Sequence, residues 1–229
     1  LNQTATTATT TASGLGAWSQ LFTLAAGTNT FNLRAVEADG DISTTTAFTL
    51  RTIGTDQMQL ASDTDQLWGW NNAGSYNAIA QTFVPTYATI SNVSLEICRT
   101  ATVTNQSIRL EVRAGSAFGQ GTLAAGWEYN VATPAQVDVI NALVPLCDNF
   151  QFVNFGLNTQ FSSGNSEPMS VTPGNTYHFL FSSGNGNIYR TKYRASGNVY
   201  ASGQMGRQEL ATWSDVAGAD LAFKTLGVP

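Results

Sequence analysis

Charged side chains, and lysine above all, are scarce in this sequence of 229 residues. Charged residues make up 11% of the chain, and the only lysines are Lys192 and Lys224. Cytoplasmic proteins usually keep their surfaces soluble with Lys and Glu, whereas the polar residues here are mostly Thr, Asn, Ser and Gln, together with 21 glycines. Such a composition favours strands and turns over helices. We therefore expect an all-β protein that works outside a cell.

Positive charge and long apolar runs are also missing. The formal net charge is −5, whereas nucleic acids and anionic membranes need a positive surface to bind them. No apolar run approaches the ~20 residues of a membrane-spanning helix. The composition thus predicts no nucleic-acid partner and no membrane span. Because the sequence begins at Leu1 rather than Met and shows no signal peptide, we expect a processed or excised form.

Residues typical of catalytic and cofactor sites are too few or too scattered. The one histidine, His178, lies in an apolar run, and no second histidine completes a zinc site or a proton relay. No nucleophile elbow, P-loop or dinucleotide fingerprint is present. A glycosidase would need two carboxylates facing each other about 5–10 Å apart, which spacing in sequence does not show. We expect no enzymatic activity, no required cofactor, and an ordinary strand position for His178.

Cysteine occurs only twice, as Cys98 and Cys147. One disulfide in an oxidising compartment fits this count. The alternative is two buried free thiols.

The N-terminal part begins with a Thr/Ala tract, residues 2–13, that has no large apolar residue. Alone it should be an extended linker, although β-branched threonines also suit a strand. Three strand-like runs follow, and in the second Phe31 and Leu33 share one face. An Asp39-Gly40 pair between the second and third runs is a strong hairpin signal. The three runs are Ala17–Leu24, Thr30–Ala38 and Thr44–Arg51.

Three segments of this part resemble the second half of bacterial immunoglobulin-like surface repeats. They read Ala-Trp-Ser at 17–19, Ala-Gly-Thr-Asn-Thr-Phe at 26–31 and Ala-Val-Glu-Ala-Asp-Gly-Asp-Ile-Ser at 35–43. A complete immunoglobulin-like sandwich needs about seven strands, and the resemblance implies only the last three. Such a half-domain cannot close its own core.

A longer β-rich region follows, with turns such as Pro173-Gly174-Asn175 between the strands. The segments 80–85, 93–95, 171–177 and 220–225 are similar, in that order, to jelly-roll modules of secreted prokaryotic proteins, which resemble carbohydrate-binding domains. We predict an antiparallel jelly-roll β-sandwich over residues 56–229, preceded by a small immunoglobulin-like β segment within residues 1–55. The predicted strands of the sandwich are Ile79–Val84, Ile90–Cys98, Ser107–Ala114, Phe150–Phe155, Thr176–Phe181, Ile188–Arg194 and Ala219–Thr225.

A tryptophan-rich segment is the candidate carbohydrate site. Trp68 and Trp70 would share a strand face and stack on sugar rings, while Asn71, Asn72 and Tyr76 supply hydrogen bonds. The alternative is that the tryptophans belong to the core or to an interface.

Two charged clusters are also candidates. Asp63, Asp65 and Asp220 could bind a structural calcium ion, or simply cap turns. In the run Ile188–Arg194 the side chains of Arg190, Lys192 and Arg194 share one face, which is either a dock for an acidic ligand or subunit, or a charged solvent face that protects an edge strand.

The incomplete N-terminal half suggests assembly, because an open sheet edge can be completed by a strand of another chain. Our leading hypothesis is an extracellular filament or surface subunit whose partners are copies of itself or neighbouring surface-protein domains. A carbohydrate-binding module is the alternative, with glycans as ligands. The half-domain could also be a fragment boundary or pack on the sandwich. The candidate assembly residues are Thr4, Thr6, Thr9, Thr11, Phe31, Leu33, Arg190, Lys192 and Arg194.

Overall fold

A computed structural model describes most of the chain beyond residue 23, and the chain divides into two units, residues 1–52 and 53–229. For residues 123–129 it describes the backbone only. The described ranges are 24–36, 39–69, 77–100, 108–121, 123–129, 144–157, 168–183, 189–209 and 212–229.

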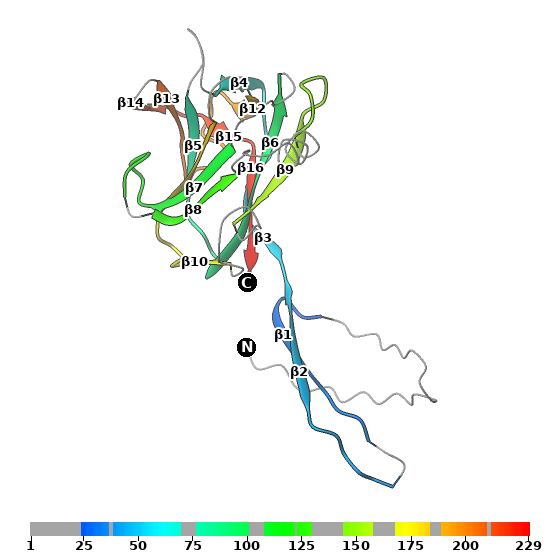
Figure 1. Cartoon of the computed structure of the whole chain (residues 1–229). Coiled ribbons are helices and arrows are strands. Elements are labelled where there is room, and N and C mark those ends of the chain that lie inside the picture. The colour runs from blue at the N-terminus through cyan, green and yellow to red at the C-terminus, as the bar shows by residue number, and fades with distance from the viewer. Residues whose placement is uncertain are drawn as a thin grey trace. The chain divides into compact units, whose positions relative to one another are not determined.

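The first unit contains a β-hairpin (Figure 1). Strands β1 (Gly27–Leu33) and β2 (Thr46–Thr52) are antiparallel, with Phe31 opposite Phe48. Gly40 has a φ of 93°, so the Asp-Gly pair predicted as the turn contains the residue type best suited to this conformation. At the base of the hairpin, the amide of Gly27 donates a 2.6 Å hydrogen bond to Oγ1 of Thr52. The predicted strand over residues 17–24 lies almost entirely outside the described residues.

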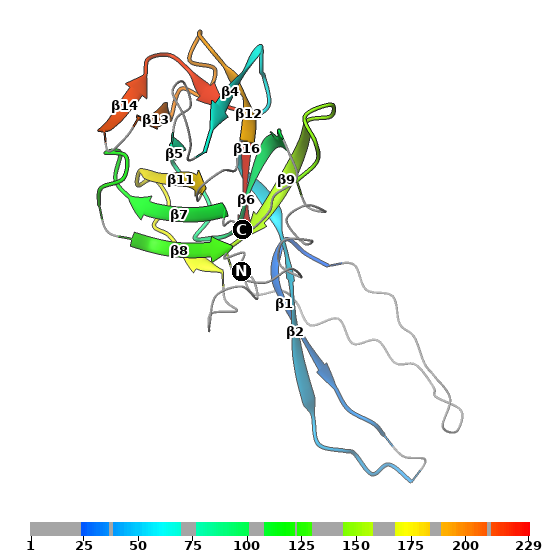
Figure 2. The same ribbon diagram turned by 45° about the horizontal axis from the view of Figure 1, so that its top comes forward.

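The second unit is a sandwich of two antiparallel sheets (Figures 1 and 2), which confirms the predicted all-β sandwich. The first sheet has the strand order β15-β12-β6-β16-β3, with β4 paired to β12 and both β9 and β10 paired to β6. Its strands are β3 (Gly54–Gln59), β4 (Thr64–Trp68), β6 (Thr89–Arg99), β9 (Gln151–Gly156), β10 (Met169–Ser170), β12 (Tyr189–Arg194), β15 (Asp220–Leu221) and β16 (Phe223–Val228).

The second sheet has the order β14-β13-β5-β11-β7-β8. Its central strands carry Ala, Ile, Val and Phe, whereas its edge strand β14 is polar and largely exposed. Its strands are β5 (Ala78–Phe83), β7 (Ile108–Ala114), β8 (Leu123–Tyr129), β11 (Tyr177–Ser183), β13 (Met205–Glu209) and β14 (Thr212–Val216).

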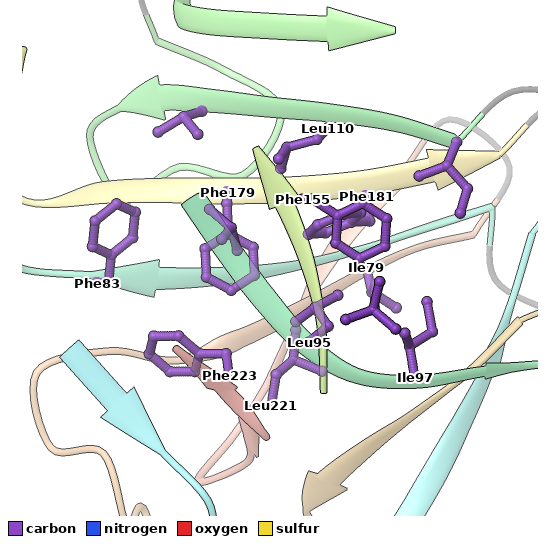
Figure 3. Close-up of a cluster of buried hydrophobic side chains, with 14 of the residues drawn as sticks. Ile79, Phe83, Leu95, Ile97, Leu110, Phe155, Phe179, Phe181, Leu221 and Phe223 are labelled. Atoms are coloured by element: carbon purple, nitrogen blue, oxygen red, sulfur yellow. The ribbon is translucent and has the colours of Figure 1, made fainter. Parts of the chain in front are cut away.

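The hydrophobic core lies between the two sheets because their strands alternate apolar and polar side chains. In β6, Leu95 and Ile97 point into the core, and Phe179 and Phe181 of β11 meet them from the other sheet (Figure 3). Burying each such side chain contributes about 1.5–3 kcal/mol. The same alternation places the other side chains of each strand on the outer face of its sheet. The candidate sites of this unit lie on these two outer faces.

The disulfide predicted between Cys98 and Cys147 is confirmed. It joins the end of β6 to the segment that begins at residue 144, where the amide of Arg99 also donates to the carbonyl of Pro145. The described ranges contain no helix with the length and apolar character of a membrane span.

Candidate functional site

The structure corrects the role given to Trp68. Its side chain is 0% exposed, it stacks on Tyr189 with ring centroids 4.9 Å apart, and its Nε1 donates a 2.7 Å hydrogen bond to Oγ1 of Thr191. A side chain that is buried in the core cannot stack on a sugar. The other four predicted sugar-binding residues, Trp70, Asn71, Asn72 and Tyr76, lie outside the described residues.

The three aspartates predicted to bind calcium do not form one site. Within the described ranges, no group of three or more His, Cys, Asp or Glu side chains is placed to hold a metal ion. Asp63 instead accepts a hydrogen bond from the amide of Ala195, as the turn-capping alternative predicts, and Asp65 forms ion pairs. Their carboxylates are therefore engaged by the protein itself.

Asp220 is fully buried and bonded to neutral donors. Its Oδ1 accepts from Nε2 of Gln81 at 3.1 Å, and its Oδ2 accepts from the amide of Tyr200 at 3.0 Å. Burial raises the pKa of this carboxyl, and the bonds from Tyr200 and Gln81 oppose the rise. The arrangement joins β15 to β5 and to the segment before β13, which makes Asp220 a structural residue.

The basic residues of β12 do share one face, but β12 is not an edge strand. It pairs with β4 on one side and with β6 and β15 on the other, so the edge-protection alternative is wrong. Arg190 forms a 2.8 Å ion pair with Asp65, and Lys192 lies 4.0 Å from the same carboxylate. Arg194 pairs with Asp63 at 3.4 Å. The role of these three residues in assembly stays a prediction.

The outer face of the first sheet brings together both lysines of the chain. The ammonium of Lys192 lies 4.3 Å from the centroid of the Phe150 ring, and that of Lys224 lies 4.5 Å from the centroid of Phe152. Ser94 of β6 lies opposite Lys224 in the sheet. We call these five residues, Ser94, Phe150, Phe152, Lys192 and Lys224, the lysine–phenylalanine face.

Sequence reasoning missed this face. Lys192 was considered only with its neighbours on β12, and the two phenylalanines were assigned only to a strand. The usable signal was the scarcity of lysine itself, together with alternation that places Lys192, Lys224 and Phe152 opposite the core-facing residues of their strands.

The outer face of the second sheet is covered by the loop that follows β7. Glu111 is buried between Arg109 and Arg113, with an N–O distance of 2.7 Å to each. Arg113 also donates to the carbonyl of Gly121, and Phe118 of the loop packs over Leu180. These contacts hold the loop on the sheet, so the buried Glu111 is a structural residue.

His178 supports the same loop. Its Nδ1 lies 2.9 Å from the carbonyl of Gly115, and the amide of Gly119 donates to its Nε2 at 3.2 Å. Both bonds are satisfied together by the neutral imidazole with its proton on Nδ1. Burial, the largest effect, lowers the pKa of His178. The residue is thus a buried strand residue that braces a loop.

The hairpin of the first unit presents an apolar face to solvent. Phe31 and Phe48 stack across the two strands with centroids 5.1 Å apart. Beside them, Leu33 and Leu50 are 36% and 45% exposed, and Phe48 is 40% exposed. Phe31 and Leu33, two predicted assembly residues, therefore lie on one face. The other four from this part, Thr4, Thr6, Thr9 and Thr11, lie outside the described residues.

Comparison with known proteins gives only remote likenesses. No protein-family model and no curated protein matches the chain. Among solved structures, it resembles the clostridial cysteine protease Cwp84 after propeptide cleavage, with a TM-score of 0.42 and 9% identity over 79% of this chain and 42% of that one. A second match is the structure of the cysteine protease and lectin-like domains of Cwp84, a surface-layer-associated protein of Clostridium difficile, with a TM-score of 0.36 and 11% identity over 72% of this chain and 36% of that one. This chain spans less than half of either structure, and scores this low assign it no ligand, activity or partner.

Proposed function

We propose that this chain is an extracellular structural or adhesive module, non-catalytic, that assembles with copies of itself by β-strand addition to its hairpin. The second unit is the rigid body, which we assign to the jelly-roll class, and the hairpin is half of an immunoglobulin-like β unit. The exposed apolar face of the hairpin is the observation that supports the proposal best. The Cys98–Cys147 disulfide supports the extracellular setting, because such bonds persist in oxidising compartments.

The hairpin is incomplete by itself. In the described part of the chain it is a sheet of two strands, and a sheet of that size is marginal in water without a third strand or a packed face. The stacked Phe31 and Phe48, with Leu33 and Leu50 beside them, supply a face that needs a partner. A strand added to a hairpin edge gains backbone hydrogen bonds and extends the sheet to three strands, and the second copy that donates it brings its own surface close to the apolar face.

The Thr/Ala tract of a second copy is the strand we assign to this role. Residues 2–13 have no large apolar residue and hence no core of their own, and their β-branched threonines suit an extended strand. Donation from one copy to the next is a head-to-tail contact, which builds a fibre unless it closes into a ring.

Light scattering and negative-stain electron microscopy test this assembly. The full chain should form oligomers or filaments, and Phe48→Asp should abolish them by placing a charge on the apolar face. Thr49→Asp is the matched control, because Thr49 is the next residue on the same strand and points to the opposite face. A monomeric full chain at high concentration would reject the proposal. Assembly that persists after removal of residues 2–13 would reject that tract as the donor.

Glycan binding is the second candidate function. It is favoured by two half-buried phenylalanine rings, Phe150 and Phe152, that lie on the outer face of the first sheet beside polar and charged side chains. Aromatic rings next to hydrogen-bonding groups suit sugars, which have both apolar C–H faces and hydroxyl groups. A glycan array with the full chain tests it, and binding to no glycan would reject it.

A further inference from the structure

Both lysines of the chain lie on one outer face of the first sheet, although they come from different strands. Lys192 belongs to β12 and Lys224 to β16. Each ammonium lies over a phenylalanine: Phe152 belongs to β9, and Phe150 is the residue just before that strand. The chain has no other lysine, so two lysine–phenylalanine pairs on one surface suggest a shared binding function.

The positive charge of the two lysines is only partly compensated. Lys192 lies 4.0 Å from Asp65, but Arg190 holds the same carboxylate at 2.8 Å. The ion pairs of the described residues include none for Lys224. Glu96, opposite Phe152 in the sheet, is the other acidic residue of this face, and the ion pairs of the described residues do not join it to either lysine. A carboxylate supplied from outside would therefore find two ammonium groups that no short ion pair holds.

The contacts that now hold the two ammonium groups are weak enough to exchange. A cation over a half-buried phenylalanine ring near solvent is a weak interaction, whereas a lysine–carboxylate hydrogen bond is charge-assisted and stronger. When an ammonium turns from its ring to a ligand carboxylate, the ring face becomes free for an apolar surface of the same ligand. The face thus offers charge and a flat apolar surface together.

An unsatisfied hydroxyl lies beneath this surface. Ser94 is 1% exposed, and its Oγ has no hydrogen-bond partner in the described structure. It lies on β6 directly opposite Lys224 on one side and Asn154 on the other. Buried hydroxyls are nearly always bonded, so an orphan beside a movable lysine marks a position where a ligand oxygen is favourable.

We propose that the lysine–phenylalanine face binds an acidic polysaccharide through its uronate sugars. This inference rests on the glycan-binding candidate and names its ligand class. The uronate carboxylate bonds to the ammonium groups of Lys192 and Lys224. The C–H face of the sugar stacks on the ring of Phe150 or Phe152. A hydroxyl group of the sugar bonds to Oγ of Ser94. Glu96, opposite Phe152 on β6, and Asn154 supply acceptors and donors for the remaining hydroxyls.

Calorimetric titration of the full chain with oligogalacturonate, and with the same oligomer as its methyl ester, tests the proposal. The ester keeps the sugar rings and removes the charge, so it should bind at least tenfold more weakly. The double substitution Lys192→Met and Lys224→Met keeps the side-chain length and should weaken binding of the acid to the level of the ester. Arg34→Met and Arg51→Met together remove the same charge from the hairpin and are the matched control, with binding unchanged. Circular dichroism verifies that each variant is folded.

The remaining outcomes separate this inference from glycan binding as such. If neutral glycans on the array bind and the lysine substitutions change nothing, the chain is a glycan-binding module and the uronate proposal is wrong. If no glycan binds, both are wrong. Equal binding of dextran sulfate and oligogalacturonate, lost equally with added salt, would show plain polyanion attraction and overturn the uronate site.

Discussion

His178 is a buried imidazole whose protonation should weaken the fold. Its folded-state pKa lies below the ordinary 6.5, chiefly because of burial, with Arg113 lowering it further and the bond to Gly115 and the charge of Glu111 opposing the shift. Between the two pKa values the unfolded chain binds more protons, so this contribution to stability is complete above about pH 6.5 and falls as the pH decreases below it. The fall is at most about 1.4 kcal/mol per pH unit.

Urea unfolding of the chain between pH 5 and pH 8 measures this effect. Because His178 is the only histidine of the chain, His178→Gln removes the one imidazole that titrates in this window. The difference in unfolding free energy between the two proteins should shrink as the pH falls below 6.5. A difference that does not change with pH would show that His178 is not held neutral in the folded protein.

Some residue positions could be predicted from sequence, and others needed the sheets. Alternation placed the apolar residues of β6 and β11 inside, because each run is long enough to show its period. Alternation did not show that Trp68 points into the core, because the face on which it lies depends on the pairing of β4 with a distant strand, β12. The lysine–phenylalanine face was hidden for the same reason.

The disulfide is the strongest single link between elements in the second unit. It closes a loop between β6 and the segment before β9, with a sequence separation of 49. Replacing both cysteines by serine should lower the free energy of unfolding by about 2–4 kcal/mol, mainly because the unfolded chain regains freedom. Chemical unfolding with and without reductant measures the loss, and reductant should leave the double-serine variant unchanged. An identical unfolding midpoint for the oxidised and reduced protein would contradict the expectation.

Long apolar strands were predicted at the level of elements, and polar ones were missed. The predictions around β5, β6, β7 and β11 coincide with observed strands, because each has a run of β-branched or aromatic residues. Strand β13 reads Met-Gly-Arg-Gln-Glu and shows no such run. It forms because it pairs with both β5 and β14, and its Gly206 leaves room for the ring of Phe118. Such support comes from tertiary neighbours and leaves little trace in the local sequence.

At the scale of the whole chain, the two units should differ in their need for a partner. All members of the main core cluster, from Trp68 to Phe223, belong to the second unit, and it contains both sheets of the sandwich. The first unit offers a hairpin whose apolar side chains are exposed, and no buried member of the core clusters belongs to it. Stability that comes from burial should therefore reside almost entirely in residues 53–229.

Thermal unfolding of a chain shortened to residues 53–229 tests this division. Because the shortened chain keeps the whole core and the disulfide, it should unfold cooperatively at a midpoint within about 4 °C of the full chain, the shift that ~1 kcal/mol produces in a domain of this size. A peptide of residues 24–52 should show no cooperative transition, as expected for a two-stranded sheet alone. A large drop in the midpoint of the shortened chain would mean that the hairpin unit stabilises its own sandwich. That result would also weaken the proposed assembly, because the apolar face of Phe31 and Phe48 would then have a partner within the chain.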